Sequence, residues 1–114
     1  MQKIHKPWGY EIIWAETENY VGKLIFINKD HRLSLQLHDF KEESILVQTG
    51  LIELEIDGNT ENRVMMKLSP GESYHITPKT VHRITAVTDA VIVEVSTPEL
   101  DDVVRLEDDY GRIK

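Results

Sequence analysis

Cysteine does not occur in this chain of 114 residues. Its absence excludes disulfide bonds and thiolate metal sites, so a bound metal would have to use imidazole, carboxylate, amide or water ligands. A chain without cysteine suits a reducing compartment, and no apolar segment typical of a secretory signal follows the first residues. We therefore expect a cytoplasmic protein.

Long apolar runs and an excess of basic residues are missing as well. No apolar run approaches the length of a membrane span, so no membrane partner is expected. The net charge of −7 argues against a nucleic-acid partner, because binding of phosphate backbones requires a basic surface. An acidic protein can still hold a small phosphorylated ligand in a local basic pocket, so small-molecule ligands stay open.

Helical periodicity is also scarce, and short apolar runs alternate instead with turn residues. This pattern is typical of an all-β sandwich or barrel. The length and an apolar content of 40% suit a single domain covering residues 1–114. One helical turn is expected near Leu100–Arg105. The expected strands are Glu11–Trp14, Leu24–Ile27, Arg32–His38, Ser44–Gln48, Leu51–Ile56, Val64–Leu68, Ser73–Ile76, His82–Ala86 and Val91–Ser96.

The expected strand Arg32–His38 separates polar side chains from leucines. Successive residues of a strand point to opposite faces, so the polar residues form one face and the leucines the other. The polar face is either exposed to solvent or directed at a site inside a barrel. The leucine face needs a cover from a second sheet, the terminal segments or another subunit, and we predict a homodimer. The polar face comprises Arg32, Ser34, Gln36 and His38, and the leucine face comprises Leu33, Leu35 and Leu37.

Four residues of ligand type could share one centre inside such a barrel. Gln36 and His38 point the same way on their strand, and Glu43 can return beside them after a short loop. His82 must arrive from a distant strand, which closure of a barrel permits. Amide, imidazole and carboxylate groups suit a divalent ion such as Zn, Mn, Fe or Ni, which the sequence does not rank. The alternative is a metal-free barrel with hydrogen-bonded polar groups, although burying an unpaired carboxylate is costly.

The first of two motifs that resemble those of the cupin superfamily lies in this region. The cupin motif G(X)5HXH(X)3–4E(X)6G has the spacing of Asp30, Gln36, His38, Glu43 and Gly50. Asp30 replaces the first glycine and Gln36 the first histidine of the motif. A glutamine amide oxygen can still bind a metal, so the second replacement is compatible with a metal site.

The second motif, G(X)5PXG(X)2H(X)3N, has the spacing of Gly71, Thr77-Pro78-Lys79, His82 and Ala86. Lys79 at the second glycine position implies a different turn there, with a cation near the barrel mouth. The resemblance implies an all-β, cupin-type double-stranded β-helix, or jelly-roll, barrel. It also implies a metal held by Gln36, His38, Glu43 and His82.

Three segments resemble, more narrowly, the cupin domain of type II mannose-6-phosphate isomerases. They are the opening Lys6–Glu11, the strand Arg32–His38 and the tail Leu100–Arg112. The resemblance implies a metal-dependent sugar or sugar-phosphate isomerase, in which a divalent ion binds adjacent sugar oxygens while a proton moves between C1 and C2. The expected partner is a small molecule, namely a sugar or sugar phosphate.

Further residues receive roles within this hypothesis. Arg32 shares the polar face and suits a phosphate or a developing enediolate, with a salt bridge at a strand end as the alternative. Glu43 is a candidate base only if it is not a metal ligand. Lys79 could bind an anion at the mouth or simply be solvated. Glu94 interrupts an apolar strand and is therefore either paired or part of a substrate site.

Two other functions stay open at this level. A non-catalytic, metal-containing cupin could bind a small carbohydrate or metabolite with the same residues, because one fold hosts many functions. A metal-dependent, dioxygenase-like cupin is the other possibility, although such chemistry usually uses three histidines where this chain has Gln36. The sequence alone therefore leaves open whether the protein is an enzyme.

Overall fold

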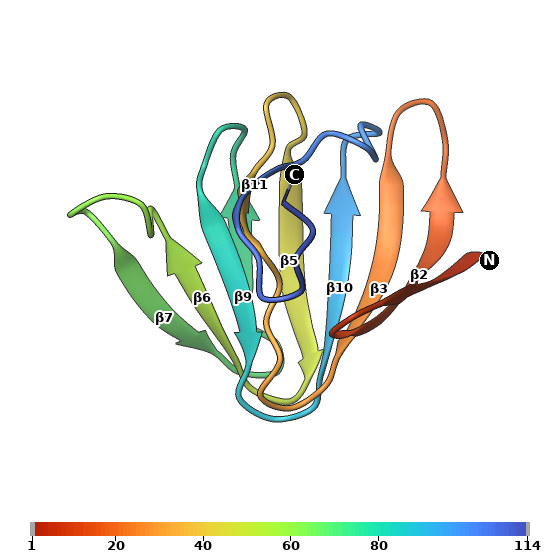
Figure 1. Cartoon of the computed structure of the whole chain (residues 1–114). Helices are drawn as coiled ribbons and strands as arrows, with labels where there is room; N and C mark the ends of the chain where they lie inside the picture. Colours follow the sequence, from red (N-terminus) through yellow and green to blue (C-terminus); the bar gives the residue numbers. More distant parts are fainter. Residues whose placement is uncertain (1, 114) are drawn as a thin grey trace.

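Eleven strands and no helix are formed by residues 2–113, which the computed structural model describes (Figure 1). The expected all-β fold is therefore confirmed. No helix among the described residues has the length and apolar character that a bilayer crossing requires. The strands are β1 (Gln2–Lys6), β2 (Gly9–Glu16), β3 (Val21–Ile27), β4 (Leu35–Leu37), β5 (Glu43–Thr49), β6 (Ile52–Ile56), β7 (Val64–Leu68), β8 (Ser73–Ile76), β9 (His82–Ala86), β10 (Ala90–Ser96) and β11 (Val104–Glu107).

Two expectations about local structure are wrong. Regular pairing within Arg32–His38 is confined to β4, and Arg32 forms only an isolated bridge to Thr85. No helix forms near Leu100–Arg105: Leu100 and Asp101 lie in a turn, and the chain is extended from Val104 onward, where it pairs with β4 as strand β11. Tertiary pairing thus overrides the local preference of this segment.

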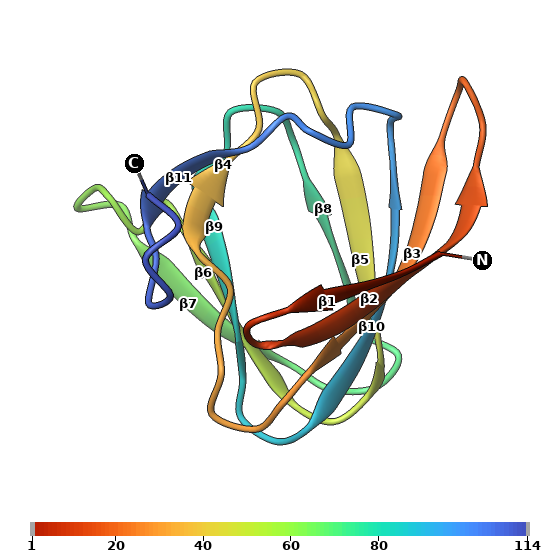
Figure 2. The ribbon, with the colours of Figure 1, turned by 45° about the vertical axis from the view of Figure 1, so that its right-hand side comes forward.

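The strands form two antiparallel sheets that face each other around a common interior (Figure 2). One sheet has the order β1-β2-β3-β10-β5-β8, and the other has the order β11-β4-β9-β6-β7. Strands far apart in the sequence, such as β3 and β10, are therefore neighbours. This arrangement of two antiparallel sheets is the one expected for a jelly-roll barrel.

The register of the central strand β10 divides the interior into an apolar and a charged part. Ile92 of β10 lies opposite Ile25 of β3 and Val47 of β5. Two residues further along, Glu94 lies opposite Lys23. Cross-strand partners point to the same face of a sheet, so charge accumulates at one end of the barrel and apolar side chains at the other. The buried apolar cluster comprises Trp8, Ile25, Ile27, Ile45, Val47, Ile52, Leu54, Ile56, Leu68, Ile76, Ile84, Ala86, Ala90 and Ile92.

The leucines of the segment 32–38 are covered by the chain itself. Leu35 is 3% exposed, and Leu33 packs against the apolar cluster. Leu37 is half-buried and pairs with Val104 of β11. Of the covers considered for this face, the chain itself supplies one, so the homodimer stays a prediction without that support.

Gly50 and Gly71, one from each sequence motif, allow a matched test of backbone strain. Both have a left-handed backbone, with φ of 83° and 89°. A Cβ atom at Gly50 would lie 2.2 Å from the carbonyl oxygen of Asp89, whereas nothing lies within 4 Å of one at Gly71. We expect Gly71→Ala to lower the free energy of unfolding by about 1–2 kcal/mol through strain alone. Gly50→Ala should cost clearly more, and equal losses in urea unfolding would contradict the packing described here.

Candidate metal centre and ligand cavity

Three of the four proposed ligands meet at the charged end of the barrel. His38 follows β4, Glu43 begins β5 and His82 begins β9, so three separate stretches of chain contribute. Each offers one ligand atom, and these atoms all lie within 4.8 Å of one another. The three residues are 5%, 4% and 2% exposed, respectively, which shields the centre from water.

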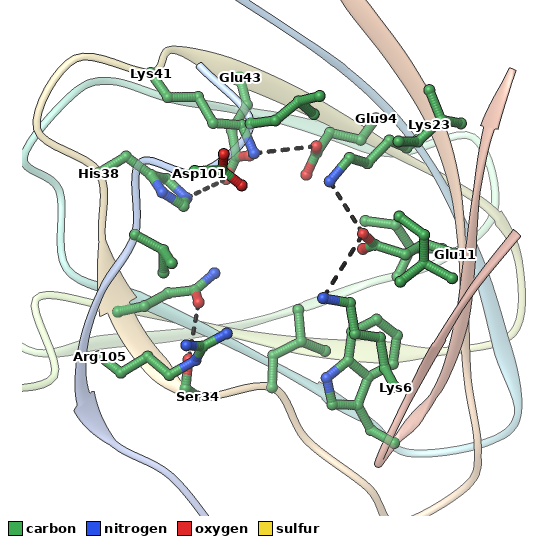
Figure 3. Close-up of a pocket in the computed structure, with 18 of the residues that line it drawn as sticks. Lys6, Glu11, Lys23, Ser34, His38, Lys41, Glu43, Glu94, Asp101 and Arg105 are labelled. Atoms are coloured by element: carbon green, nitrogen blue, oxygen red, sulfur yellow. Dashed lines mark hydrogen bonds and ion pairs between the residues drawn. The ribbon is translucent and has the colours of Figure 1, made fainter. Parts of the chain in front are cut away.

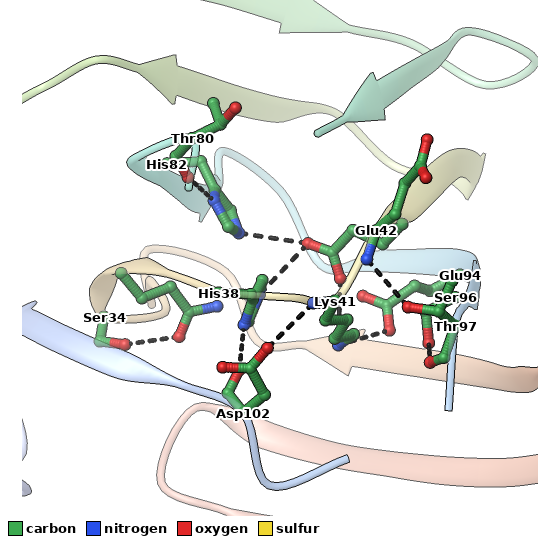
Figure 4. A network of polar contacts seen from close by, with 12 residues as sticks. Ser34, His38, Lys41, Glu42, Thr80, His82, Glu94, Ser96, Thr97 and Asp102 are labelled. Carbon is green, nitrogen blue, oxygen red and sulfur yellow. Dashed lines mark hydrogen bonds and ion pairs between the residues drawn. The ribbon is translucent and has the colours of Figure 1, made fainter. Parts of the chain in front are cut away.

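Hydrogen bonds at the far side of each ring fix the orientation of the two imidazoles (Figure 4). Nδ1 of His38 lies 2.5 Å from the backbone carbonyl oxygen of Asp102, and Nδ1 of His82 lies 2.8 Å from that of Thr80. A carbonyl oxygen only accepts hydrogen bonds, so each Nδ1 carries a proton and donates it. Both Nε2 atoms are thereby directed at Glu43 Oε1, at 3.6 Å from His38 and 3.2 Å from His82.

The two imidazoles and the carboxylate of Glu43 are arranged so that a positive charge between them would be favourable. With Nδ1 protonated, a neutral imidazole presents the lone pair of Nε2, here toward a carboxylate. The lone pairs repel the carboxylate unless a cation lies between them, whether a metal ion or additional protons on the rings. Nε2 of His38 is buried and has no hydrogen-bond partner among residues 2–113. The donor set of two imidazoles and a carboxylate therefore fits a divalent metal ion.

Glu43 is held in the ionised form that a metal ligand needs. Burial alone would raise the pKa of Glu43, but its close contacts with His38 and His82 and the charge of Lys41 hold that pKa well below its ordinary value. Nζ of Lys41 lies 3.1 Å from Oε2 of Glu43. The carboxylate thus offers Oε1 to the two rings and Oε2 to the lysine.

Gln36, the fourth proposed ligand, lies beside the centre. Its backbone pairs with that of His82 between β4 and β9, and its side chain lines the same cavity as His38. Its Oε1 accepts a hydrogen bond from Ser34 Oγ at 2.8 Å. An amide oxygen has a second lone pair, so this bond is compatible with ligation, and the ligand role of Gln36 stays a prediction.

Glu94 is paired. The sequence left two alternatives for this residue, pairing or a place in a substrate site, and the structure shows the first. Glu94 is 6% exposed, and Nζ of Lys41 donates a hydrogen bond of 3.4 Å to its Oε2. Burial and the negative charge of Glu43 raise the pKa of Glu94 to about 8, against the attraction of Lys41. For Lys41 itself, burial lowers the pKa, but Glu94 and Glu43 together raise it above its ordinary value. A chain of close polar contacts thus runs from the candidate metal centre through Lys41 to Glu94.

A cavity of about 330 Å³ adjoins the candidate metal centre (Figure 3). His38, Glu43, Lys41 and Glu94 line one side of it. Its volume lies at the lower end of the range for small-molecule sites. Its remaining charged lining side chains are Lys6, Glu11, Glu16, Lys23, Asp101, Arg105 and Arg112.

Glu11 and Lys23 form a second buried charge cluster in this cavity. They are 7% and 8% exposed, and Lys23 Nζ lies 3.1 Å from Glu11 Oε1. Lys6 Nζ approaches the same oxygen at 4.0 Å. Lys6 and Glu11 belong to the opening segment that carried part of the family resemblance, but nothing local in the sequence indicated that they face the cavity with Lys23.

The structure does not bring Arg32 to the cavity. Its guanidinium forms two hydrogen bonds with Asp109, of 2.7 and 2.8 Å, at the surface. Because the chain is irregular around residues 32–34, the alternation of faces breaks down, and Leu33 lines the cavity instead. The expectation that Arg32 shares the inward face is wrong, and its catalytic and substrate-binding roles gain no support from this geometry.

Lys79 lies outside the cavity as well. Its side chain is exposed, and it is not among the residues that line the cavity. Its backbone has a φ of 66°, and its N–H donates a hydrogen bond of 2.6 Å to the carbonyl oxygen of His38. The residue thus ties its turn to the loop that carries His38, and its predicted anion-binding role is untested.

Asp102 was not singled out by the sequence, yet it organises the loop between His38 and Glu43. Its carboxylate accepts hydrogen bonds from the backbone N–H groups of Asp39, Phe40 and Lys41 at 3.0, 2.7 and 2.9 Å. These bonds, with Phe40 and Lys41 contributing most, lower the pKa of Asp102. The tail therefore supports the centre from outside the two motifs, and only the family resemblance of the tail hinted at this.

Because Arg32 lies at the surface, we predict that replacing it has little effect on stability, metal affinity or activity. Exposed ion pairs contribute about 0–1 kcal/mol, so Arg32→Ala should lower the free energy of unfolding by no more than that. We expect metal affinity and any catalytic activity to stay within about twofold of the unmodified chain, since the guanidinium is absent from the cavity lining. Urea unfolding and the metal and activity measurements described below check this. A large loss of activity at unchanged stability would restore the role that the sequence suggested.

A known family matches nearly the whole chain: residues 1–108 match the family described as mannose-6-phosphate isomerase C-terminal. The chain is 32% identical over 98% of its length to the mannose-1-phosphate guanylyltransferase ManC of Salmonella typhimurium. It is 30% identical over 96% of its length to the alginate biosynthesis protein AlgA of Pseudomonas aeruginosa. The chain spans only 23% of the length of each of these relatives.

Several solved structures share this architecture. KdgF from Halomonas sp. superimposes with a TM-score of 0.76 at 19% identity, over 89% of this chain and 91% of that one. An RmlC-like cupin from Shewanella frigidimarina gives a TM-score of 0.77 at 16% identity, over 88% of this chain and 86% of that one. At such identities the likeness concerns the fold, and it confirms the cupin-type barrel expected from the motif spacing.

Proposed function

The chain belongs to the mannose-6-phosphate isomerase C-terminal family, and from that premise we propose that it is a metal-dependent isomerase of a sugar phosphate such as mannose 6-phosphate. One observation carries the proposal. Two imidazoles, each fixed by a carbonyl at Nδ1, direct Nε2 at a buried carboxylate beside a charged cavity. Such a centre suits a divalent cation, and the cavity suits a polar small molecule.

His38, Glu43 and His82, with Gln36, would hold the metal, for which Zn, Mn, Fe and Ni are all chemically suitable. When bound, the ion would polarise the adjacent sugar oxygens and stabilise the charge that develops at them. The carbonyl contacts of the two histidines keep their Nε2 atoms available to it. Asp102 fixes the loop between His38 and Glu43 and so positions both side chains.

Glu94 is the residue to which we assign proton transfer. Isomerisation removes a proton from C2 of the aldose and delivers one to C1, which requires a group within the cavity that accepts and returns a proton. Glu94 is the buried carboxylate next to the centre that is not a proposed metal ligand. Lys41 bridges it to Glu43, and this contact holds the Glu94 side chain toward the centre.

The direct test is turnover of mannose 6-phosphate by the full chain loaded in turn with Zn²⁺, Mn²⁺, Fe²⁺ and Ni²⁺. Formation of fructose 6-phosphate is measured by a coupled assay, with a His38→Ala/His82→Ala double variant as the control. We expect turnover that requires one of the metals and is abolished in the double variant. Binding of sugar phosphate without turnover with any metal would overturn the isomerase and leave a non-catalytic binding cupin.

A further inference from the structure

Four basic side chains besides Lys41 gather in the cavity of a chain whose net charge is −7. Lys6 of β1, Lys23 of β3, Arg105 of β11 and Arg112 near the C-terminus all line it. In Figure 3, Lys6 and Arg105 lie across the cavity from Glu43 and Glu94. Lys6 and Arg105 therefore give the cavity a basic side away from the candidate metal centre, whereas Lys23 lies opposite Glu94.

Local carboxylates do not neutralise this basic cluster. Glu11 is shared by Lys23 and Lys6, at 3.1 and 4.0 Å. Arg112 is paired with Asp108 at 2.7 Å. Glu94 also lies opposite Lys23 across β10 and β3, so Arg105 is the member of the cluster left without a carboxylate at ion-pair distance among the described residues. The other carboxylates lining the cavity are exposed, in Glu16 and Asp101, or belong to the centre described above, in Glu43 and Glu94.

Arg105 is the member of the cluster without a carboxylate partner. It forms no ion pair within the described residues 2–113, and its Nε is buried without a hydrogen-bond partner there. Its backbone pairs with Gln36, which in turn pairs with His82. Cross-strand partners point to the same face, so the three side chains form a row across β11, β4 and β9. This row places the guanidinium one strand beyond the candidate metal ligands.

The neighbouring basic side chains also affect the pKa of Lys6. Its pKa is lowered first by burial and then by the nearby charges of Lys23, Arg112 and Arg105, against the attraction of Glu11. Repulsion among half-buried cations is relieved when an anion binds among them. The cluster therefore has the electrostatic character of an anion site whose anion comes from outside the chain.

The geometry points to an anion subsite formed by Arg105 and Lys6, which binds the phosphate group of a phosphorylated sugar whose other end reaches the candidate metal centre. This inference rests on the function proposed above and specifies how its substrate is held. A guanidinium can bind two phosphate oxygens at once, while an ammonium adds a point charge. One guanidinium and one ammonium together carry two positive charges, which matches a phosphate monoester dianion.

The test measures ligand binding by calorimetry. The ligands are inorganic phosphate, mannose 6-phosphate and mannose. The proteins are the metal-loaded full chain and its Arg105→Gln, Lys6→Gln and Arg105→Gln/Lys6→Gln variants. Arg63→Gln is the matched control, because Arg63 pairs with Glu55 at 2.9 Å, away from the cavity. We expect the Kd of phosphate to rise roughly tenfold in Arg105→Gln and further in the double variant, since a charge-assisted hydrogen bond typically contributes this much. Arg63→Gln should bind phosphate like the unmodified chain.

A parallel measurement on the His38→Ala/His82→Ala variant separates this subsite from phosphate held by a metal. Loss of phosphate binding in the histidine variant, with retention in the Arg105→Gln/Lys6→Gln variant, would overturn the subsite. Absence of phosphate binding by the unmodified chain would overturn it too. If phosphate binds through Arg105 but mannose 6-phosphate is not isomerised, the subsite stands and the isomerase falls. If the Arg105→Gln/Lys6→Gln variant isomerises mannose 6-phosphate with an unchanged KM, the isomerase stands and the subsite falls.

Discussion

Replacing His38 and His82 together by alanine is expected to lower the affinity of the chain for Zn²⁺ by well over 100-fold. Loss of a single group that merely orients a ligand commonly costs about 10–100-fold in metal affinity, and this change removes two proposed ligands outright. What remains is Glu43, whose second oxygen is occupied by Lys41, and Gln36. Neither provides the imidazole nitrogens on which a transition-metal site of this kind depends.

Calorimetric titration with Zn²⁺ gives the affinity, and thermal unfolding provides a second readout. A metal that binds only the folded state stabilises it by about 2.7 kcal/mol at a hundredfold excess over Kd, so Zn²⁺ should raise the Tm of the unmodified chain and not that of the double variant. His75→Ala is the matched control, because His75 is exposed and paired only with Glu42.

Either of two results would contradict the metal centre. One is retention of stoichiometric Zn²⁺ binding by the His38→Ala/His82→Ala variant. The other is failure of the unmodified chain to bind any divalent metal. In the second case the positive charge required between the imidazoles and Glu43 is supplied by protons on the rings, and the cluster is a hydrogen-bonded structural unit. Circular dichroism of each variant shows whether it has kept its fold.

The resemblance of the residue spacing to the cupin motifs predicted which residues meet, because a jelly roll converts spacing into position. Glu43 and His82 each begin a strand, and His38 follows one, so their side chains are directed by regular backbone. The turn glycine Gly50 ends the first motif at a left-handed position that no other residue fits well. Strand alternation and turn chemistry account for the local geometry, whereas the meeting of His82 with the other two residues was implied by the resemblance to cupins.

Strand alternation gave a wrong prediction for Arg32, because the regular strand expected over Arg32–His38 does not extend to this residue. The ladder of β4 begins only at Leu35, and the backbone before it is irregular, so counting faces backward from His38 misplaces Arg32. The basic residues that do line the cavity lie far from the motifs, on β1, β3 and the tail. Their convergence depends on how the two sheets and the C-terminal strand close, which no local pattern in one sequence specifies.

Replacing Glu94 by glutamine is expected to lower kcat for isomerisation of mannose 6-phosphate by about 10²–10⁴-fold, the range typical of a lost acid–base group. The amide keeps the size of the side chain and can still accept a hydrogen bond from Lys41, but it no longer accepts a proton. Substrate binding depends on other groups, so KM should change far less than kcat, and the Zn²⁺ affinity should be retained.

The division between kcat, KM and metal affinity is what identifies the role of Glu94. Steady-state kinetics and calorimetry on Glu94→Gln are compared with Glu53→Gln, a half-buried carboxylate on β6 that does not line the cavity. If Glu94 only neutralised Lys41, its loss would disturb Glu43 through that lysine, and metal affinity would fall together with kcat. A full kcat in Glu94→Gln would require another cavity carboxylate as the base, and Glu11, already shared by two lysines, would be the next residue to replace.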